Sequence, residues 1–168
     1  MSQKIKIAFV ILCIAVPFLL YCVYYYSMMI GNAPYRFSDF QSIQFEYGNG
    51  DSLVNKWNSK THDYQYVDSH DSLVKKKLHV RNDDLLYLHR KAAELGFWNF
   101  PNVEVNNTPQ AKALNAPHYL MVFNYKHKSK RVLFDEAFDG DPKLKDANEQ
   151  MIKVIEKVLN DEEDRERK

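Results

Sequence analysis

Histidines are the side chains of this 168-residue chain that are best suited to bind a metal or to transfer a proton near neutral pH. Two of the six, His62 and His70, flank a candidate strand and have Asp63, Asp68 and Asp71 close in sequence. If these side chains converged, they could bind a metal or form a general base held by a carboxylate. The alternative function that we keep open is therefore a membrane-anchored hydrolase or metal-dependent enzyme using the His62/His70 region.

Other signs of catalysis are missing from the sequence. No two histidines have the i, i+4 spacing of a helical zinc site, and neither a G-x-S-x-G nor a G-x-x-x-x-G-K motif occurs. The acids between Asp135 and Asp141 lack the spacing of a calcium-binding loop. We therefore expect no catalytic residue, no metal and no cofactor. The balance of 23 basic and 22 acidic residues also argues against a nucleic-acid partner.

Aromatic and amide side chains in irregular segments are the candidate binding residues. Loops on a rigid scaffold commonly carry function, and two long segments without periodicity, 48–61 and 102–117, could present such a surface. A run of aromatic residues that follows a predicted helix has two interpretations, core packing or an exposed binding patch. The candidates are Trp57, Phe97, Trp98, Phe100, Asn106 and Asn107.

The N-terminal segment has the character of a membrane element. After Lys4 and Lys6, Ile7 to Ile30 carry no charge, which is long enough for a helix to cross the bilayer. A cleaved signal peptide is the alternative. Its only small-x-small site is Gly31-Asn32-Ala33, and Pro34 after it should hinder cleavage. We therefore expect an uncleaved anchor that contacts the lipid bilayer through Ile7 to Ile30.

Flanking charge predicts the orientation of this anchor. Lys4 and Lys6 precede the apolar run, whereas only Arg36 follows it closely. The positive-inside rule then places the N-terminus in the cytoplasm and the rest of the chain outside, in the periplasm or on the cell surface. Both cysteines fall in the apolar run, so the remainder is free of thiols, as suits an oxidising compartment.

The rest of the chain predicts one small α+β domain. Alternating apolar residues indicate half-buried strands, and apolar residues at helical spacing indicate two amphipathic helices. The expected order is β-β-β-α-β-β-α, an antiparallel sheet with two helices packed on one face. The strands are expected at 42–47, 63–68, 74–80, 119–125 and 131–135, and the helices at 83–95 and from Pro142 onward.

This partition gives four segments and one leading functional hypothesis. Residues 1–30 form a cytoplasmic stub and transmembrane signal anchor, 31–40 a tether, 41–160 the extracytoplasmic domain and 161–168 a charged, frayed tail. We expect the domain to bind a protein or envelope component without catalysis, as an inhibitor or immunity-like protein would. The sequence leaves the identity of the partner and the oligomeric state open.

Overall fold

A computed structural model describes residues 3–32, 35–50, 52–106 and 115–167. The chain divides into two compact units, Met1–Tyr35 and Arg36–Lys168, and each is described by itself.

The first unit consists of one long helix, α1 (Gln3–Asn32), which continues through Pro17. At about 1.5 Å per residue, 30 residues exceed the roughly 30 Å hydrocarbon core of a bilayer. Within α1, Phe9–Ser27 is long and apolar enough to cross a membrane, and none of it is buried against other parts of the protein. This helix is compatible with a membrane anchor, and equally with a signal sequence.

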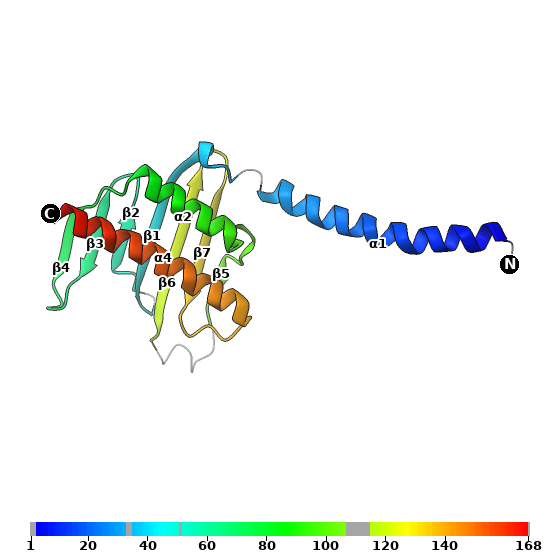
Figure 1. Cartoon of the computed structure of the whole chain (residues 1–168). Helices are drawn as coiled ribbons and strands as arrows, with labels where there is room; N and C mark the ends of the chain where they lie inside the picture. Colours follow the sequence, from blue (N-terminus) through cyan, green and yellow to red (C-terminus); the bar gives the residue numbers. More distant parts are fainter. Residues whose placement is uncertain (1–2, 33–34, 51, 107–114, 168) are drawn as a thin grey trace. The chain divides into compact units, whose positions relative to one another are not determined.

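The second unit is α+β and is built on a seven-stranded mixed sheet (Figure 1). The sheet order is β4-β3-β2-β1-β6-β7-β5, and the pairs are antiparallel except for β5 with β7, which is parallel. The strands are β1 (Phe40–Asn49), β2 (Asn55–Asn58), β3 (Asp63–Val67), β4 (Leu73–Lys77), β5 (Val103–Glu104), β6 (Pro117–Tyr125) and β7 (Ser129–Asp135).

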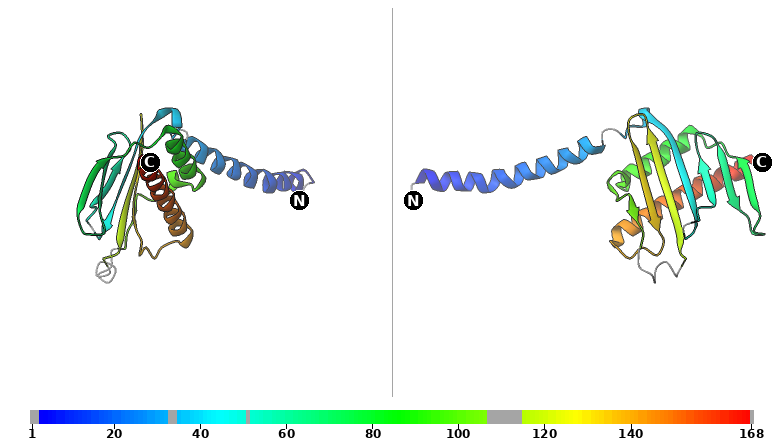
Figure 2. Two further views of the ribbon diagram at one scale, coloured as in Figure 1. Left: turned by 60° about the vertical axis from the view of Figure 1, so that its left-hand side comes forward. Right: turned by 180° about the vertical axis from the view of Figure 1, so that it is seen from behind.

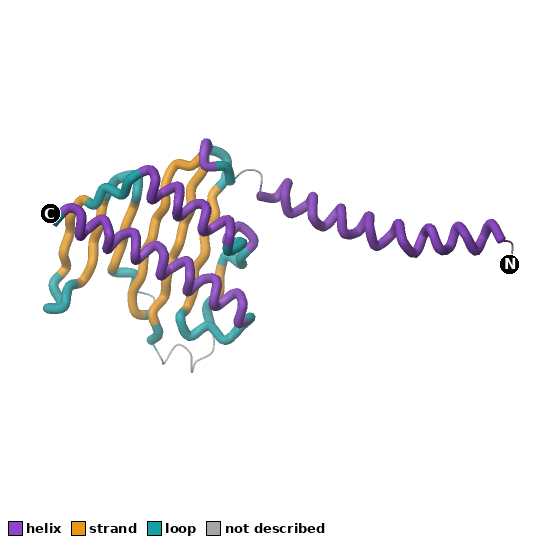
Figure 3. Tube along the Cα trace, viewed as in Figure 1, coloured by secondary structure: helices purple, strands orange, loops and turns teal. Residues whose placement is uncertain are grey.

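Two helices, α2 (Asn82–Glu94) and α4 (Pro142–Glu166), cover one face of this sheet. Figure 2 shows the sheet and these two helices as two layers, and no described helix of this second unit lies on the opposite face of the sheet. In Figure 3, α4 crosses the sheet obliquely and α2 lies beside it. Asp141 caps α4 by accepting a hydrogen bond from the Lys143 N–H at 2.9 Å. Short 3-10 turns, η1 (Phe37–Asp39) and η2 (Phe97–Asn99), precede β1 and follow α2.

The core lies between the two layers and follows from the period of two along each strand. Ile43 and Phe45 of β1 point to the helices and are fully buried, whereas Gln44 between them faces the open side. Across the strand pair they meet Phe123 and Met121 of β6, which are fully buried as well. The helices complete this core with a stripe of buried residues from each.

The predicted α+β class and the apolar N-terminal helix are confirmed, but the predicted order of elements is wrong. Four strands precede α2, because a short strand, β2, lies in the segment expected to be irregular. Between α2 and α4 the structure has three strands instead of the two predicted, because it also contains β5. The parallel pairing of β5 with β7 makes the sheet mixed rather than antiparallel. Both are short, four and two residues, so neither produces a period long enough to recognise.

The C-terminal segment also differs from the expected frayed tail. Helix α4 continues to Glu166, and Glu162 and Glu163 are buried with 6% and 9% of their surface exposed. Ion pairs hold this end: Arg165 contacts Asp84 at 2.7 Å, and Lys76 contacts Glu163. Oppositely charged side chains on α2 and β4 therefore order a segment whose own composition predicts a solvated tail.

Candidate functional site

Two adjoining cavities lie between α4 and the sheet, and together they form what we call the α4 groove. One has a volume of about 260 Å³ and the other about 210 Å³, and Glu156 lines both. The first is lined by Tyr119, Phe134, Glu136, Glu149, Ile152, Lys153 and Glu156. The second is lined by Phe45, Tyr47, Tyr64, Glu156, Leu159 and Asn160.

The acids of the groove share one face of α4 because of helical spacing. Glu149 and Glu156 are seven residues apart, which is two turns or about 10 Å along the helix. Glu149 is paired with Lys153 at 3.8 Å, the i, i+4 neighbour. Burial raises the pKa of the Glu156 carboxyl, Glu136 raises it further by repulsion, and Lys153 opposes both. The middle of the groove therefore holds a carboxyl group that makes no ion pair with the described residues.

The opposite wall of the groove carries tyrosines from three strands. Tyr47 of β1 pairs directly with Tyr119 of β6, and their rings stack with centroids 5.9 Å apart. Tyr64 comes from β3. Burial raises the pKa of the Tyr119 phenol to about 12, with repulsion from Glu136 and Glu156 adding to it. Burial first and nearby carboxylates second also raise the pKa values of Tyr47 and Tyr64, so all three phenols stay protonated at neutral pH.

These groups retain unused hydrogen-bonding capacity. Within the described part of the chain, neither the Glu156 carboxylate nor the phenols of Tyr47, Tyr64 and Tyr119 make a hydrogen bond or ion pair with the protein. A carboxylate attracts a cation, and aromatic faces add a cation–π attraction. The arrangement is therefore suited to holding an ammonium or guanidinium group.

The aromatic candidates from the sequence lie in the core instead. Trp57 is 1% exposed, and Phe97 is fully buried. Trp98 and Phe100 are also buried, and the rings of Phe97 and Trp98 pack against Phe123 at centroid distances of 5.1 and 5.5 Å. Of the two interpretations of this cluster, their positions favour core packing, because a partner cannot reach buried rings.

The two amide candidates lie elsewhere. Asn106 is half-buried after β5, where its side chain donates to the Ala137 carbonyl and accepts from the Asp139 N–H at 3.4 Å. It thus fastens the chain after β5 to the turn after β7. Asn107 lies outside the described residues.

His62 and His70 do not converge. They stand before and after β3, whose five residues extend about 13 Å from first to last at about 3.3 Å per step. His70 is exposed in the β3–β4 turn beside Asp68, whereas His62 contacts His79. The structure therefore gives no support to a catalytic or metal site built from His62 and His70. No group of three or more His, Cys, Asp or Glu residues in the described ranges is placed to hold a metal ion.

A second imidazole lies beside a carboxylate at the end of the sheet. Nε2 of His118 is 3.7 Å from Oδ2 of Asp135, and both side chains are largely buried. The Asp135 carboxylate also accepts a hydrogen bond from the Ala137 N–H at 2.8 Å. It therefore caps the turn after β7, which is a structural role.

A buried polar cluster joins β5, β7 and α4 away from the groove. Asn148 of α4 donates to the Glu104 carboxylate at 2.6 Å, and both residues are almost fully buried. Lys130 of β7 donates to the Phe100 carbonyl and to Asn102 Oδ1. Burial raises the pKa of Glu104 to about 7, although Asn148 and Lys130 act against the shift. Burial likewise lowers the pKa of Lys130.

The groove residues were not among the candidates from the sequence. Tyr47 and Tyr119 occupy inward positions in strands whose residues alternate between apolar and polar, and they therefore resemble ordinary core residues. A local signal does exist in the acids of the last helix, since Glu149, Glu156 and Glu163 repeat every seven residues on one side of its apolar stripe.

Comparison with known proteins identifies no relative: no family model, no curated protein and no solved structure matches this chain. The fold and the groove define an α+β domain that follows an apolar N-terminal helix and has an acidic, tyrosine-lined groove beside α4.

Proposed function

We propose that this protein is a membrane-anchored, non-enzymatic binding protein whose extracytoplasmic domain holds a basic side chain of a protein partner in the α4 groove. The observation that carries the proposal is the set of unused groups around Glu156. A half-buried carboxylate and three phenols face two adjoining cavities, and none of them makes a hydrogen bond or an ion pair with the described residues. Keeping a carboxylate there costs free energy, and a bound cation would offset that cost.

Charge and shape support a Lys or Arg side chain as the occupant. Glu136, Glu149 and Glu156 outnumber the one groove lysine, Lys153. The walls around them are largely aromatic and aliphatic, which suits the methylene stem of such a side chain. The apolar α1 supports presentation of the domain at a membrane surface.

A photo-crosslinking experiment tests the proposal. The full chain, with a photoreactive phenylalanine analogue in place of Tyr119, is expressed in its native membranes and irradiated. We expect one reproducible protein adduct, whose mapped crosslink lies next to a Lys or Arg. Adding Glu156→Gln should reduce its yield at least tenfold, because removing the charge leaves the cation unpaired.

The matched control is Glu94→Gln on α2, where the acid is exposed and its one ion pair among the described residues is with Lys91. This variant should leave the adduct unchanged. The absence of any adduct, or an adduct equally abundant in Glu156→Gln, would overturn the proposal.

A further inference from the structure

His62 and His79 are 17 residues apart in the sequence, and their imidazole rings meet at one end of the sheet. Nε2 of His62 is 3.3 Å from Nδ1 of His79, and the ring centroids are 4.4 Å apart. His62 ends the β2–β3 turn, whereas His79 follows β4. Among the described residues, the His79 ring is the only hydrogen-bonding partner of the His62 ring.

The backbone around His62 is held in an unusual conformation. His62 has φ of 60°, which is uncommon for a residue with a side chain and costs free energy unless the surroundings impose it. Its carbonyl accepts a hydrogen bond from the Leu78 N–H at 2.8 Å, which ties the turn to the residue before His79.

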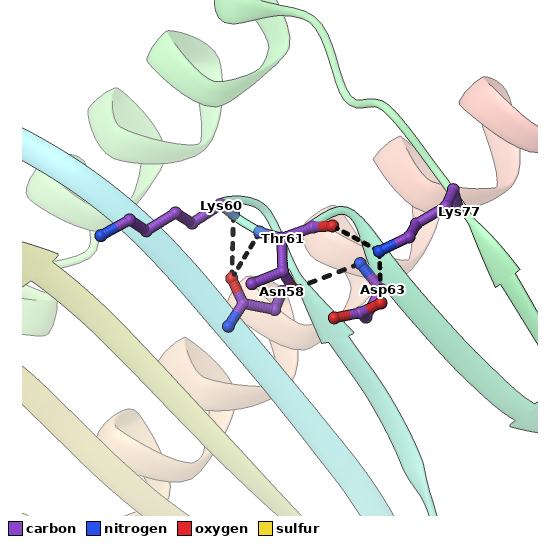
Figure 4. A network of polar contacts seen from close by, with 5 residues as sticks. All are labelled: Asn58, Lys60, Thr61, Asp63 and Lys77. Carbon is purple, nitrogen blue, oxygen red and sulfur yellow. Dashed lines mark hydrogen bonds and ion pairs between the residues drawn. The ribbon is translucent and has the colours of Figure 1, made fainter.

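The turn itself is fixed by the network of polar contacts shown in Figure 4. Asn58 Oδ1 accepts from the N–H groups of Lys60 and Thr61 at 2.9 and 3.4 Å. Lys77 Nζ donates to the Thr61 carbonyl at 3.0 Å and pairs with Asp63 at 2.7 Å. These contacts join β4 to the turn, so they preorganise the spacing between His62 and His79.

We propose that His62 and His79 bind a divalent transition metal of the zinc class. Two imidazole nitrogens bound to one tetrahedral Zn²⁺ at 2.0–2.1 Å lie about 3.3–3.4 Å apart, which is the spacing found here. Metals of this class favour imidazole nitrogens as ligands, whereas calcium and magnesium favour oxygen ligands. The pair supplies two ligands, and water completes an open coordination sphere.

A carboxylate stands beside the pair. Glu166, in the last turn of α4, accepts a hydrogen bond from the His79 N–H at 3.5 Å. A metal at the two imidazoles would join the turn before β3 to the segment after β4, whose His79 N–H already contacts the end of α4. This gives the site a structural consequence, because a ligand that binds only the folded chain raises its thermal stability.

The test is a Zn²⁺ titration of the full chain in detergent micelles, purified without a histidine tag and stripped with a chelator. We expect one Zn²⁺ per chain and a rise in the melting temperature. His62→Gln and His79→Gln should each weaken binding at least tenfold and remove the rise. His70→Gln is the matched control, because the exposed His70 imidazole lies in the β3–β4 turn, at the opposite end of β3 from His62. This variant should bind Zn²⁺ like the wild type.

Nitrogen NMR of the histidine rings in the unmodified chain gives a second readout. Zn²⁺ should shift Nε2 of His62 and Nδ1 of His79 and leave the His70 ring unchanged. Failure of the wild type to bind Zn²⁺, or binding by both the His62→Gln and the His79→Gln variant as strong as that of the wild type, would overturn the proposal. Because no groove residue is altered, neither result bears on the binding function proposed above.

Discussion

Glu104 is a carboxylic acid with 1% of its surface exposed, and its ionisation links pH to stability. Burial raises its pKa from an ordinary 4.5 to about 7, so the folded chain binds this proton more tightly than the unfolded chain does. Between about pH 4.5 and 7 the folded state therefore holds more protons, and the free energy of unfolding falls as the pH rises. The stabilising contribution is complete below about pH 4.5 and is lost above about pH 7.

The first prediction concerns Glu104→Gln, which removes the titration and keeps an oxygen that can accept from Asn148. The variant should be more stable than the wild type at pH 8, by at most about 3–4 kcal/mol, because one pKa unit corresponds to about 1.36 kcal/mol. The difference should shrink to near zero at pH 4.5. Urea unfolding, followed by the fluorescence of buried Trp57 and Trp98, measures both limits.

The exposed acid Glu94 provides the control. Glu94→Gln should leave the difference from the wild type constant across this pH range, because its carboxylate is solvated and paired only with Lys91. A wild-type chain that is as stable at pH 8 as Glu104→Gln, with the same pH dependence, would contradict the prediction.

At the residue scale, the sequence shows which side chains are present but not which of them meet. His62 lies near His79 rather than His70. Strand β3 separates His62 from His70, whereas the pairing of β3 with β4 brings His62 close to His79. Glu156 becomes distinctive only through Tyr47 and Tyr119, which lie on strands far away in sequence. Burial and pairing of this kind depend on tertiary contacts, so local spacing cannot reveal them.

The end of α4 is the element whose order depends most on its neighbours. Lys76 of β4 contacts Glu163 and lies over the rings of Tyr64 and Tyr66 at 5.6 and 5.8 Å. This ammonium therefore neutralises a buried carboxylate and makes two cation–π contacts. The neighbouring Lys77 points to the other face, where its pair with Asp63 is largely exposed.

These two lysines allow a matched comparison. Lys76→Met should destabilise the protein by about 1–3 kcal/mol, because it leaves Glu163 buried without its counter-charge. Lys77→Met should change stability by less than about 0.5 kcal/mol, as is usual for exposed pairs. Urea unfolding of both variants at neutral pH measures the difference. Equal effects would mean that the end of α4 is not docked on the sheet.

At the element scale, length and regularity decided what the sequence could predict. Strands β1, β6 and β7 and both amphipathic helices follow from clear periods over five residues or more. Strand β2 has only Trp57 as a buried apolar residue among Asn and Lys, and β5 has two residues, so pairing with neighbours rather than local pattern defines them. The same holds for the last turns of α4, where partners on β4 and α2 supply the order.

At the scale of the whole molecule, the chain combines an apolar helix with a charged α+β unit, and both proposed sites belong to the second unit. A partner could reach the groove only from the compartment that holds this unit. Orientation is therefore the property on which the proposed function depends most. Lys4 and Lys6 before the apolar run, against Arg36 alone shortly after it, favour a cytoplasmic N-terminus.

Cysteine labelling tests this orientation, because Cys13 and Cys22 are the only cysteines and both lie in α1. In a background with Cys13→Ser and Cys22→Ser, a single Ser69→Cys in the exposed β3–β4 turn should react with a membrane-impermeant maleimide on intact spheroplasts. A single Ser2→Cys should react only after lysis, since a positively charged N-terminus stays in the cytoplasm.

The two labels also separate an anchor from a cleaved signal sequence. An uncleaved anchor retains the Ser2→Cys label in the full-length band after lysis, and that band stays with the membrane fraction. Loss of the N-terminal label from the mature protein would instead indicate cleavage. Labelling of Ser2→Cys before lysis, with Ser69→Cys protected, would reverse the orientation. The α4 groove would then face the cytoplasm, and the search for its partner would move to that compartment.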